Sequence, residues 1–204
     1  MTPTAQQYHH GDLPNALRAA AADVITEKGL GSFSLREVAR RAGVSHAAPA
    51  HHFGDTSGLL TSLAIEAFQH LGTALRQAES ANADPVERLA AIGKAYVNIA
   101  VDHPAHCEVM FRHDLINAGD SGYADAATAA HQVLEDVLEA VAAAVNPELD
   151  VATAADACWV AMQGIVVLHA NMTGLDEKAE RPAKTLDDRV DTVTTHLVQG
   201  FRKR

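Results

Sequence analysis

The sequence predicts an all-α fold, and three features carry that prediction. Hydrophobic residues make up 48% of the 204-residue chain, enough for a sizeable core, while aromatic residues make up only 4%. Alanine, the strongest helix former, is abundant, and no strand-like alternation of Val, Ile and Thr dominates. Apolar residues recur instead at helical spacing, in about nine segments separated by Gly, Pro and capping residues.

The first two helices have clear boundaries. A helix is expected between Asp12, a candidate N-cap, and Gly29, a helix stop. Ser34 and Glu37 have the spacing of a capping box, in which each side chain satisfies the other's backbone amide. Gly43 ends this second helix after about two turns, because glycine adopts the left-handed conformation without steric cost.

A third short helix leads into a long one. Ser45 is a candidate N-cap for a helix that runs to about Phe53, and we expect Pro49 to shape its start without making contacts of its own. Residues 54–56 break the chain again. The long amphipathic helix that follows carries an apolar stripe of Leu59, Leu60, Leu63, Ala67, Phe68, Leu71 and Leu75.

The remaining helices are longer. Asp84 and Pro85 read as an N-cap and first helical residue, of a helix that ends near His103. A short segment, a loop at 119–122, a helix up to Asn146 and a helix from about 150 to 172 follow. Residues 173–184 are polar and predict a mobile loop. The residues from Thr185 to Asp188 cap a last helix, whose apolar face is predicted to hold Leu186, Val190, Val193, Leu197 and Phe201.

The second and third helices form a helix-turn-helix, because two short helices joined by a Gly-containing turn have a longer helix behind them. Ala39 is small enough for the helices to approach closely, and Val44 can fill the wedge between them. Such a motif places the N-terminal residues of its second helix in the major groove, while caps and backbone amides bind phosphates.

Residues 34–53, SLREVARRAGVSHAAPAHHF, followed by Leu59 and Leu60, resemble the tetracycline-repressor (TetR) family of bacterial regulators. In the rest of the chain, HPAHCEVMF (103–111) and WVAMQG (159–164) are similar to the carboxy-terminal regions of members with a Trp-His-Gly motif. Gln163 stands where that motif has histidine.

The resemblance implies a helix-turn-helix DNA-binding domain at 1–57 and a helical ligand-binding and dimerisation domain at 58–204. It implies a homodimer with a four-helix interface made by the last two long helices of each subunit. The expected function is a ligand-responsive transcriptional regulator, most often a repressor, that binds a palindromic double-stranded DNA operator. A small-molecule effector would tilt the helix near Thr56 and release the DNA.

Eight residues are candidates for DNA binding. Phosphate candidates are Ser34, Arg36, Ser45 and His52, and base-edge candidates are His46, Ala47 and His51. Thr56 completes the set, but it stands where the family usually has a phosphate-binding lysine, and Ala50 stands where it usually has tyrosine. The loss of such contacts predicts modest DNA affinity.

The ligand candidates are apolar and aromatic residues with a few polar ones, as ligand pockets require, although each of them also fits a plain core role. They are Tyr96, Met110, Phe111, His113, Trp159, Met162, Gln163 and Val166.

A metal site is not predicted. His51 and His52 are adjacent, so their side chains diverge by about 100° on a helix. His103, His106, Cys107 and His113 suit zinc or copper by type, but their spacing scatters them. No cofactor is expected. A ligand-binding, metal-sensing or redox-sensing dimer with weakened DNA binding stays open as the alternative function.

The charge distribution and the motifs limit which other classes of protein function are possible. The net charge is −10, but residues 1–76, here called the head, hold six basic and six acidic residues and six of the twelve histidines. The head is therefore neutral, and its charge permits DNA binding. The two cysteines form no paired motif, which fits a reducing cytoplasm. The start of the chain does not read as a signal peptide, and no apolar run reaches the roughly 18 residues of a membrane span. No Gly-rich phosphate loop, Gly-x-Ser-x-Gly or His-Glu-x-x-His motif occurs, so an enzyme is not expected.

Overall fold

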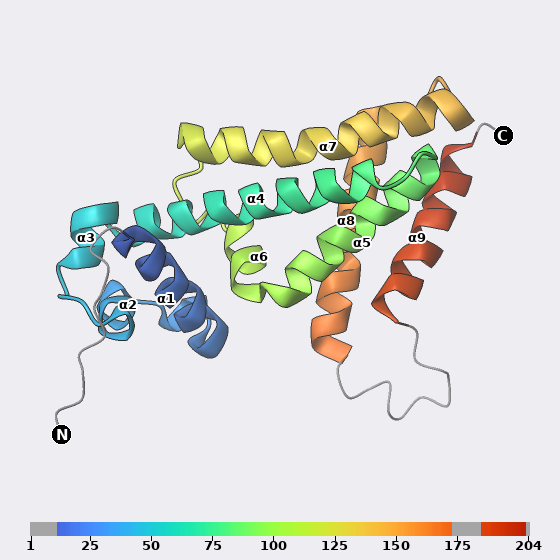
Figure 1. The fold of residues 1–204 in the computed structure, drawn as a ribbon. Coiled ribbons are helices and arrows are strands. Elements are labelled where there is room, and N and C mark those ends of the chain that lie inside the picture. The colour runs from blue at the N-terminus through green and yellow to red at the C-terminus, as the bar shows by residue number, and fades with distance from the viewer. Residues whose placement is uncertain (1–11, 173–184, 203–204) are drawn as a thin grey trace. The chain divides into compact units, whose positions relative to one another are not determined.

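In the computed structural model, which describes residues 12–172 and 185–202, α-helices make up most of the fold (Figure 1). Within these ranges there are nine α-helices, one short 3-10 helix and no strand, so the all-α prediction is confirmed. In chain order the elements are α1 (Leu13–Lys28), η1 (Leu30–Ser32), α2 (Leu35–Ala42), α3 (Ala48–Phe53), α4 (Thr56–Ser80), α5 (Pro85–Asp102), α6 (Pro104–Met110), α7 (Ser121–Val145), α8 (Val151–Met172) and α9 (Leu186–Phe201).

The helices form two compact units. The first unit comprises the described part of residues 1–66 together with 105–123, and the second comprises 67–104 and the described part of 124–204. Helix α4 contributes to both units, because the division falls after Glu66. The boundary after residue 57 stays a prediction.

In the first unit, α1, α2 and the start of α4 bury a common apolar core. The predicted stripe on α4 is buried along its whole length in both units, from Leu59 to Leu75. Ala39 is fully buried where α2 approaches its neighbours, and Gly43 has a positive φ of 68°, so α2 ends as the helix-turn-helix pattern predicts. The amide of Val44 then donates to the carbonyl of Ala39 across 3.0 Å.

Two local predictions in the head are wrong. Helix α3 begins at Ala48 and not just after Ser45, because the amide of Ala48 closes a turn onto the carbonyl of Ser45 at 3.0 Å. The N-cap is Ala47, which has no side chain that could accept a hydrogen bond. Pro49 is buried, so it packs inside the unit as well as shaping the helix start.

The predicted capping box at α2 is half formed. The Ser34 hydroxyl accepts a hydrogen bond from the Glu37 amide at 3.3 Å. The Glu37 carboxylate, however, accepts from Lys28 and Arg40. Charged donors hold a carboxylate more strongly than a neutral amide does, which explains the exchange of partners.

The second unit packs α5, α8 and α9 against one another. Asp84 caps α5 by accepting from two amides, and Thr185 and Asp188 form the predicted capping box of α9. The most buried residues of α9 are Val190, Thr194 and Val198, a face offset from the predicted one. The predicted loop at 173–184 lies outside the described residues.

Helix α8 is unusually apolar. Its segment Val151–Asn171 has a mean hydropathy of 1.6 and is the one candidate for a membrane span among the described helices. The prediction that no apolar run reaches that length is corrected on this measure, because α8 contains a single charged residue, Asp156, which lowers its mean hydropathy little. One such helix is weak evidence for a membrane, since a core helix of a soluble protein passes the same test.

Candidate nucleic-acid interface and ligand pocket

The helix-turn-helix presents an exposed polar surface. All eight DNA-binding candidates are exposed, on α2, the following turn, α3 and the start of α4. They are Ser34, Arg36, Ser45, His46, Ala47, His51, His52 and Thr56. Ala50, on the same short helix, is exposed as well. The fold therefore leaves the whole predicted set accessible to a ligand as large as DNA.

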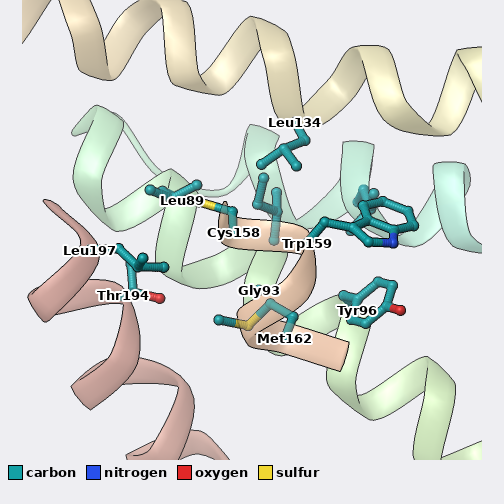
Figure 2. Close-up of a pocket in the computed structure, with 11 residues that line it drawn as sticks. Leu89, Gly93, Tyr96, Leu134, Cys158, Trp159, Met162, Thr194 and Leu197 are labelled. Carbon is teal, nitrogen blue, oxygen red and sulfur yellow. The ribbon is translucent and has the colours of Figure 1, made fainter. Parts of the chain in front are cut away.

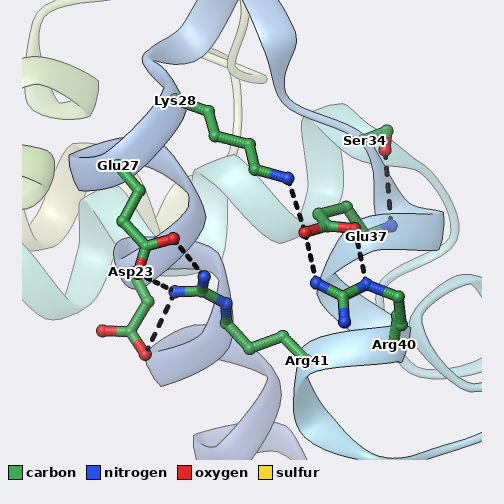
Figure 3. Close-up of polar contacts among 7 residues, drawn as sticks. All are labelled: Asp23, Glu27, Lys28, Ser34, Glu37, Arg40 and Arg41. Atoms are coloured by element: carbon green, nitrogen blue, oxygen red, sulfur yellow. Dashed lines mark hydrogen bonds and ion pairs between the residues drawn. The ribbon is translucent and has the colours of Figure 1, made fainter.

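Ion pairs between α1 and α2 hold the motif together (Figure 3). The Lys28 amine lies 2.6 Å from Glu37 on α2, and Arg40 contacts the same carboxylate at 2.8 Å. Hydrogen bonds from Arg40 and then Lys28 lower the pKa of Glu37 to about 2. Arg41 is held in the same way, against Glu27 and Asp23 of α1.

These pairs limit the positive charge that the motif can offer to phosphates. Arg40 and Arg41 both form ion pairs with carboxylates of the same unit, and Arg40 shares Glu37 with Lys28. Within residues 12–172 and 185–202, Arg36 makes no ion pair, and it differs in this respect from Arg40 and Arg41. The sequence predicts a phosphate-binding role for Arg36, and that role stays a prediction.

A second set of contacts ties α1 to α4. The guanidinium of Arg18 forms an ion pair with Glu66 and donates a hydrogen bond to the Ser62 hydroxyl at 3.2 Å. His106 of α6 lies 4.0 Å from the other oxygen of Glu66. The first helix of the unit is therefore anchored to the helix that follows the DNA-binding motif.

The second unit contains an apolar cavity of about 30 Å³ (Figure 2). Helices α5, α8 and α9 supply most of its wall, and α4 and α7 contribute one leucine each. The lining residues are Leu75, Leu89, Ile92, Gly93, Tyr96, Leu134, Cys158, Trp159, Met162, Thr194 and Leu197.

Aromatic rings and one buried thiol define the character of this cavity. The rings of Tyr96 and Trp159 lie 5.3 Å apart with their planes tilted by 56°. The Tyr96 hydroxyl donates to the Gln163 side-chain oxygen at 2.5 Å. Burial raises the pKa of the Cys158 thiol to about 11, so this thiol is neutral at physiological pH.

The predicted ligand residues do not all come together. Tyr96, Trp159 and Met162 line the cavity, and Gln163 joins it through its hydrogen bond to Tyr96. Val166 lies on α8 but is not part of the lining.

The other three candidates, Met110, Phe111 and His113, belong to the first unit and do not line the cavity. The Tyr123 hydroxyl donates to the Met110 carbonyl at 3.0 Å and lies 2.9 Å from the His113 ring nitrogen. These residues join α6 and its following loop to the start of α7, which accounts for their apolar and aromatic character.

Sequence reasoning missed eight of the lining residues. Most are leucines and similar residues that fit an ordinary helix core, namely Leu75, Leu89, Ile92, Leu134, Cys158, Thr194 and Leu197. Gly93 gave the one usable signal, since an isolated glycine inside a helical pattern often marks close packing. A Cβ placed there would lie 3.1 Å from Val190 and 3.2 Å from the sulfur of Met162.

Metal binding has no structural support within the described part of the chain. There, no group of three or more His, Cys, Asp or Glu side chains could hold an ion. His106 instead lies near Glu66, and His113 contacts Tyr123.

Two protein-family models match the chain. The model of the tetR family of bacterial regulatory proteins matches residues 17–63, which include the whole helix-turn-helix. The model of the tetracyclin repressor-like C-terminal domain matches residues 89–193, which include most of the cavity wall. The chain belongs to the TetR family. It is accordingly a DNA-binding transcriptional regulator with the helix-turn-helix and all-α fold of that family.

Relatives of known sequence are similar to this TetR-family chain over about a third of its length. The HTH-type transcriptional regulator BetI of Yersinia pestis is 40% identical over 73 residues, which are 34% of this chain and 36% of BetI. The similarity thus spans about a third of the length of this relative. The corresponding protein of Serratia proteamaculans is 37% identical over 70 residues, 33% of this chain and 35% of that protein.

Solved structures extend the similarity to the whole chain. A protein of unknown function from Rhodococcus sp. RHA1 is 30% identical with a TM-score of 0.79, and the match covers 98% of this chain and 100% of that one. The TetR-family regulator PfmR of Thermus thermophilus shares the fold at 22% identity and a TM-score of 0.69, over 92% and 99% of the two chains. FadR of Bacillus subtilis, solved with stearoyl-CoA, shares it at 18% identity and a TM-score of 0.72, over 91% and 98%.

Proposed function

We propose that this TetR-family protein is a ligand-responsive repressor. As a homodimer it binds a palindromic double-stranded DNA operator, and a small molecule in the α5–α8–α9 cavity releases it. One observation carries the proposal: the same chain joins an exposed helix-turn-helix to an apolar cavity that is lined by aromatic residues.

The DNA contacts follow from the position of each residue in the motif. Ser34, Arg36, Ser45 and His52 bind phosphates, with Thr56 at the start of α4 as a weak hydroxyl contact. His46 and Ala47 in the turn, and His51 on α3, face base edges, where alanine offers only a methyl contact to thymine. These assignments rest on the exposure of all eight side chains.

The effector site is the cavity lined by Tyr96, Trp159 and Met162, with Gln163 behind Tyr96. Ligand pockets are mostly apolar with a few polar groups, and this cavity has that character. FadR of Bacillus subtilis, a regulator of similar fold, was solved with stearoyl-CoA, which supports small-molecule binding in this fold.

The finer classification follows the sequence. We place the protein in the Trp-His-Gly subgroup, with Gln163 in place of the histidine and bonded to Tyr96. The protein acts in the cytoplasm, where the operator is accessible, and it needs no metal or cofactor. A regulator of this kind binds its ligand without chemical turnover, so we do not assign an enzymatic activity.

One observation favours a second candidate function, a ligand-binding dimer with weakened affinity for DNA. Ala50 and Thr56 are exposed where the family usually has tyrosine and lysine, and Arg40 and Arg41 are held in internal ion pairs. The positive charge left for phosphates is therefore small, and affinity falls with each lost phosphate contact.

A footprinting experiment on the DNA that flanks the protein's own gene tests the main proposal. The folded dimer should protect a palindromic site at about 50 mM salt, a concentration at which phosphate contacts are strong. The variant Arg36→Ala should weaken protection, while Arg76→Ala, outside the motif, should leave it unchanged. Absence of protection by folded dimer at low salt would overturn the DNA-binding role.

A further inference from the structure

The described residues that line the α5–α8–α9 cavity include no charged side chain. Among the described residues that line it, aliphatic, aromatic and sulfur-containing side chains predominate, and none is charged at neutral pH. The nearby ion pair of Lys94 with Asp191 joins α5 to α9 at 2.8 Å without contributing to the lining. A charged ligand group would thus lose its hydration without gaining a partner in this wall.

The few polar groups of the wall are small or already engaged. They are the Tyr96 hydroxyl, the Trp159 indole N–H, the Cys158 thiol and the Thr194 hydroxyl. The Tyr96 hydroxyl donates a hydrogen bond to the Gln163 side-chain oxygen. The raised pKa of Cys158, about 11, has burial as its cause, so this part of the wall disfavours a charge on its own thiol.

The cavity is also compact. Its volume of about 30 Å³ compares with the roughly 150 Å³ of an engineered apolar cavity that binds benzene. A ligand must therefore displace a side chain, and Met162 is the side chain best suited to move because it is unbranched and flexible. Figure 2 shows Met162 beside Gly93, whose missing side chain leaves room for the sulfur.

We propose that the effector is a compact, uncharged and predominantly apolar molecule, of the size of one alkyl-substituted aromatic ring, that packs against Tyr96 and Trp159 and displaces Met162. This inference rests on the ligand-responsive function proposed above. It excludes carboxylates, quaternary ammonium ions and coenzyme A thioesters as ligands of this cavity. Each of them carries a charged group that would lie against uncharged lining residues.

Trp159 makes a direct test possible, because it is the chain's one tryptophan and it lines the cavity. The full-length protein is titrated with ethylbenzene, phenylacetate, benzyltrimethylammonium and stearoyl-CoA while tryptophan fluorescence is followed. Ethylbenzene should change the fluorescence and bind on the order of 100-fold more tightly than either charged ring compound, since burying an unpaired charge costs several kcal/mol.

Two variants separate the cavity from a general loss of packing. Met162→Ala enlarges the cavity, so n-butylbenzene should gain on the order of tenfold in affinity relative to ethylbenzene, as two further CH₂ groups become buried. Met110→Ala removes an equally buried methionine from the first unit and should leave that ratio unchanged. An unchanged ratio in Met162→Ala would overturn the assigned role of Met162.

The outcomes distinguish this inference from the function on which it rests. Tighter binding of a charged probe, with the Trp159 signal changed, would overturn the uncharged class but keep the cavity as an effector site. Failure of every uncharged probe to change Trp159 fluorescence would overturn the inference as well. The footprint is measured without ligand, so its loss would instead overturn the DNA-binding function.

Discussion

At the scale of single residues, positive charge is scarce among the residues predicted to bind DNA. Arg40 and Arg41 flank the turn of the helix-turn-helix, yet both point their guanidinium groups at carboxylates of the same unit. Arg36, Ala47 and exposed histidines and serines occupy the other candidate positions, and Thr56 begins α4 without a charge. Since phosphate affinity depends on the number of cations that contact the backbone, single substitutions here should change binding measurably.

Restoring the missing phosphate contacts is the first prediction. Thr56→Lys with Ala50→Tyr should raise operator affinity about tenfold or more, because a hydrogen bond to a charged group contributes roughly 1.5–3 kcal/mol. The slope of log affinity against log salt should steepen by about one unit for the added lysine. Fluorescence anisotropy over a salt series measures both quantities.

The control for this experiment is Thr128→Lys, which adds the same charge at an exposed position of α7. Its salt slope should match that of the natural chain. Equal affinity of the natural and restored chains would count against a weakened DNA grip.

The lowered pKa of Glu37 predicts how the stability of the folded chain changes at acid pH. Its pKa lies at about 2 in the folded chain, below the ordinary 4.5, because Arg40 and Lys28 hydrogen-bond its charged form. A lowered folded-state pKa adds stability above about pH 4.5, and that stability is lost as pH falls towards 2. Glu37→Gln should therefore be less stable than the natural chain at pH 7, and the difference should shrink over this acid range.

Urea unfolding at a series of pH values, followed by circular dichroism, measures this difference. Glu139→Gln is the control, because Glu139 is an exposed carboxylate of α7. A difference that stays constant from pH 7 to pH 2 would show that the ion pairs of Glu37 do not contribute through its charge.

At the scale of elements, close helix packing shapes the cavity. Helix α5 approaches α8 and α9 at Gly93, where a Cβ would meet Val190 at 3.1 Å and the Met162 sulfur at 3.2 Å. Met162 can bend away, but Val190 is fully buried and has no free direction of movement. The separation of the three helices is thus set by a residue without a side chain.

Gly93→Ala should therefore destabilise the chain by about 1–3 kcal/mol, the typical cost of overpacking. It should also weaken binding of an apolar ligand, because the added methyl group and the displaced Met162 side chain reduce the cavity. Thermal and urea unfolding give the stability, and the Trp159 titration gives the affinity.

Gly200→Ala serves as the matched comparison, since a Cβ at that position of α9 has nothing within 4 Å in the described part of the chain. It should leave stability unchanged or raise it by up to about 1 kcal/mol through higher helix propensity. Similar destabilisation by both substitutions would contradict the packing explanation for Gly93.

At the scale of the whole molecule, α8 carries apolar residues that the described part of the chain does not cover. Val160, Val167 and Leu168 are 71%, 49% and 54% exposed, and their spacing places them on one face of the helix. Only 28% of the apolar window of α8 is buried within the chain. Contiguous exposed apolar surface marks an interaction site, and we take this face to be part of the homodimer interface.

Val160→Glu combined with Leu168→Glu should then convert the dimer to a monomer, since two charges would be buried without partners. The monomer should keep its helical circular dichroism but lose operator affinity, because a palindromic site needs both heads. Sedimentation velocity measures the assembly state. Thr128→Glu, a single added charge on α7, should remain dimeric, and a doubly substituted chain that stays dimeric would place the interface elsewhere.

Local structure was largely predictable from the sequence, and the physical reason is the short range of the interactions. Asp84 and Thr185 cap their helices through amides two or three residues away, and Gly43 ends α2 through its own backbone conformation. The start of α3 was predicted wrongly because Ser45, a good N-cap by type, is used in a preceding turn.

By itself, the sequence determined the all-α class, the helix-turn-helix and the exposed residues on its two helices and turn. Spacing over three or four residues sets caps, turns and amphipathic faces. Only the tertiary structure decided which residues share the cavity, which arginines of α2 form ion pairs with α1 or within α2, and why position 93 has no room for a side chain. Those outcomes depend on residues far apart in the chain: Tyr96 meets Gln163, and Arg41 meets Glu27, only once the helices have packed. Packing selects these partners, and no local pattern encodes them.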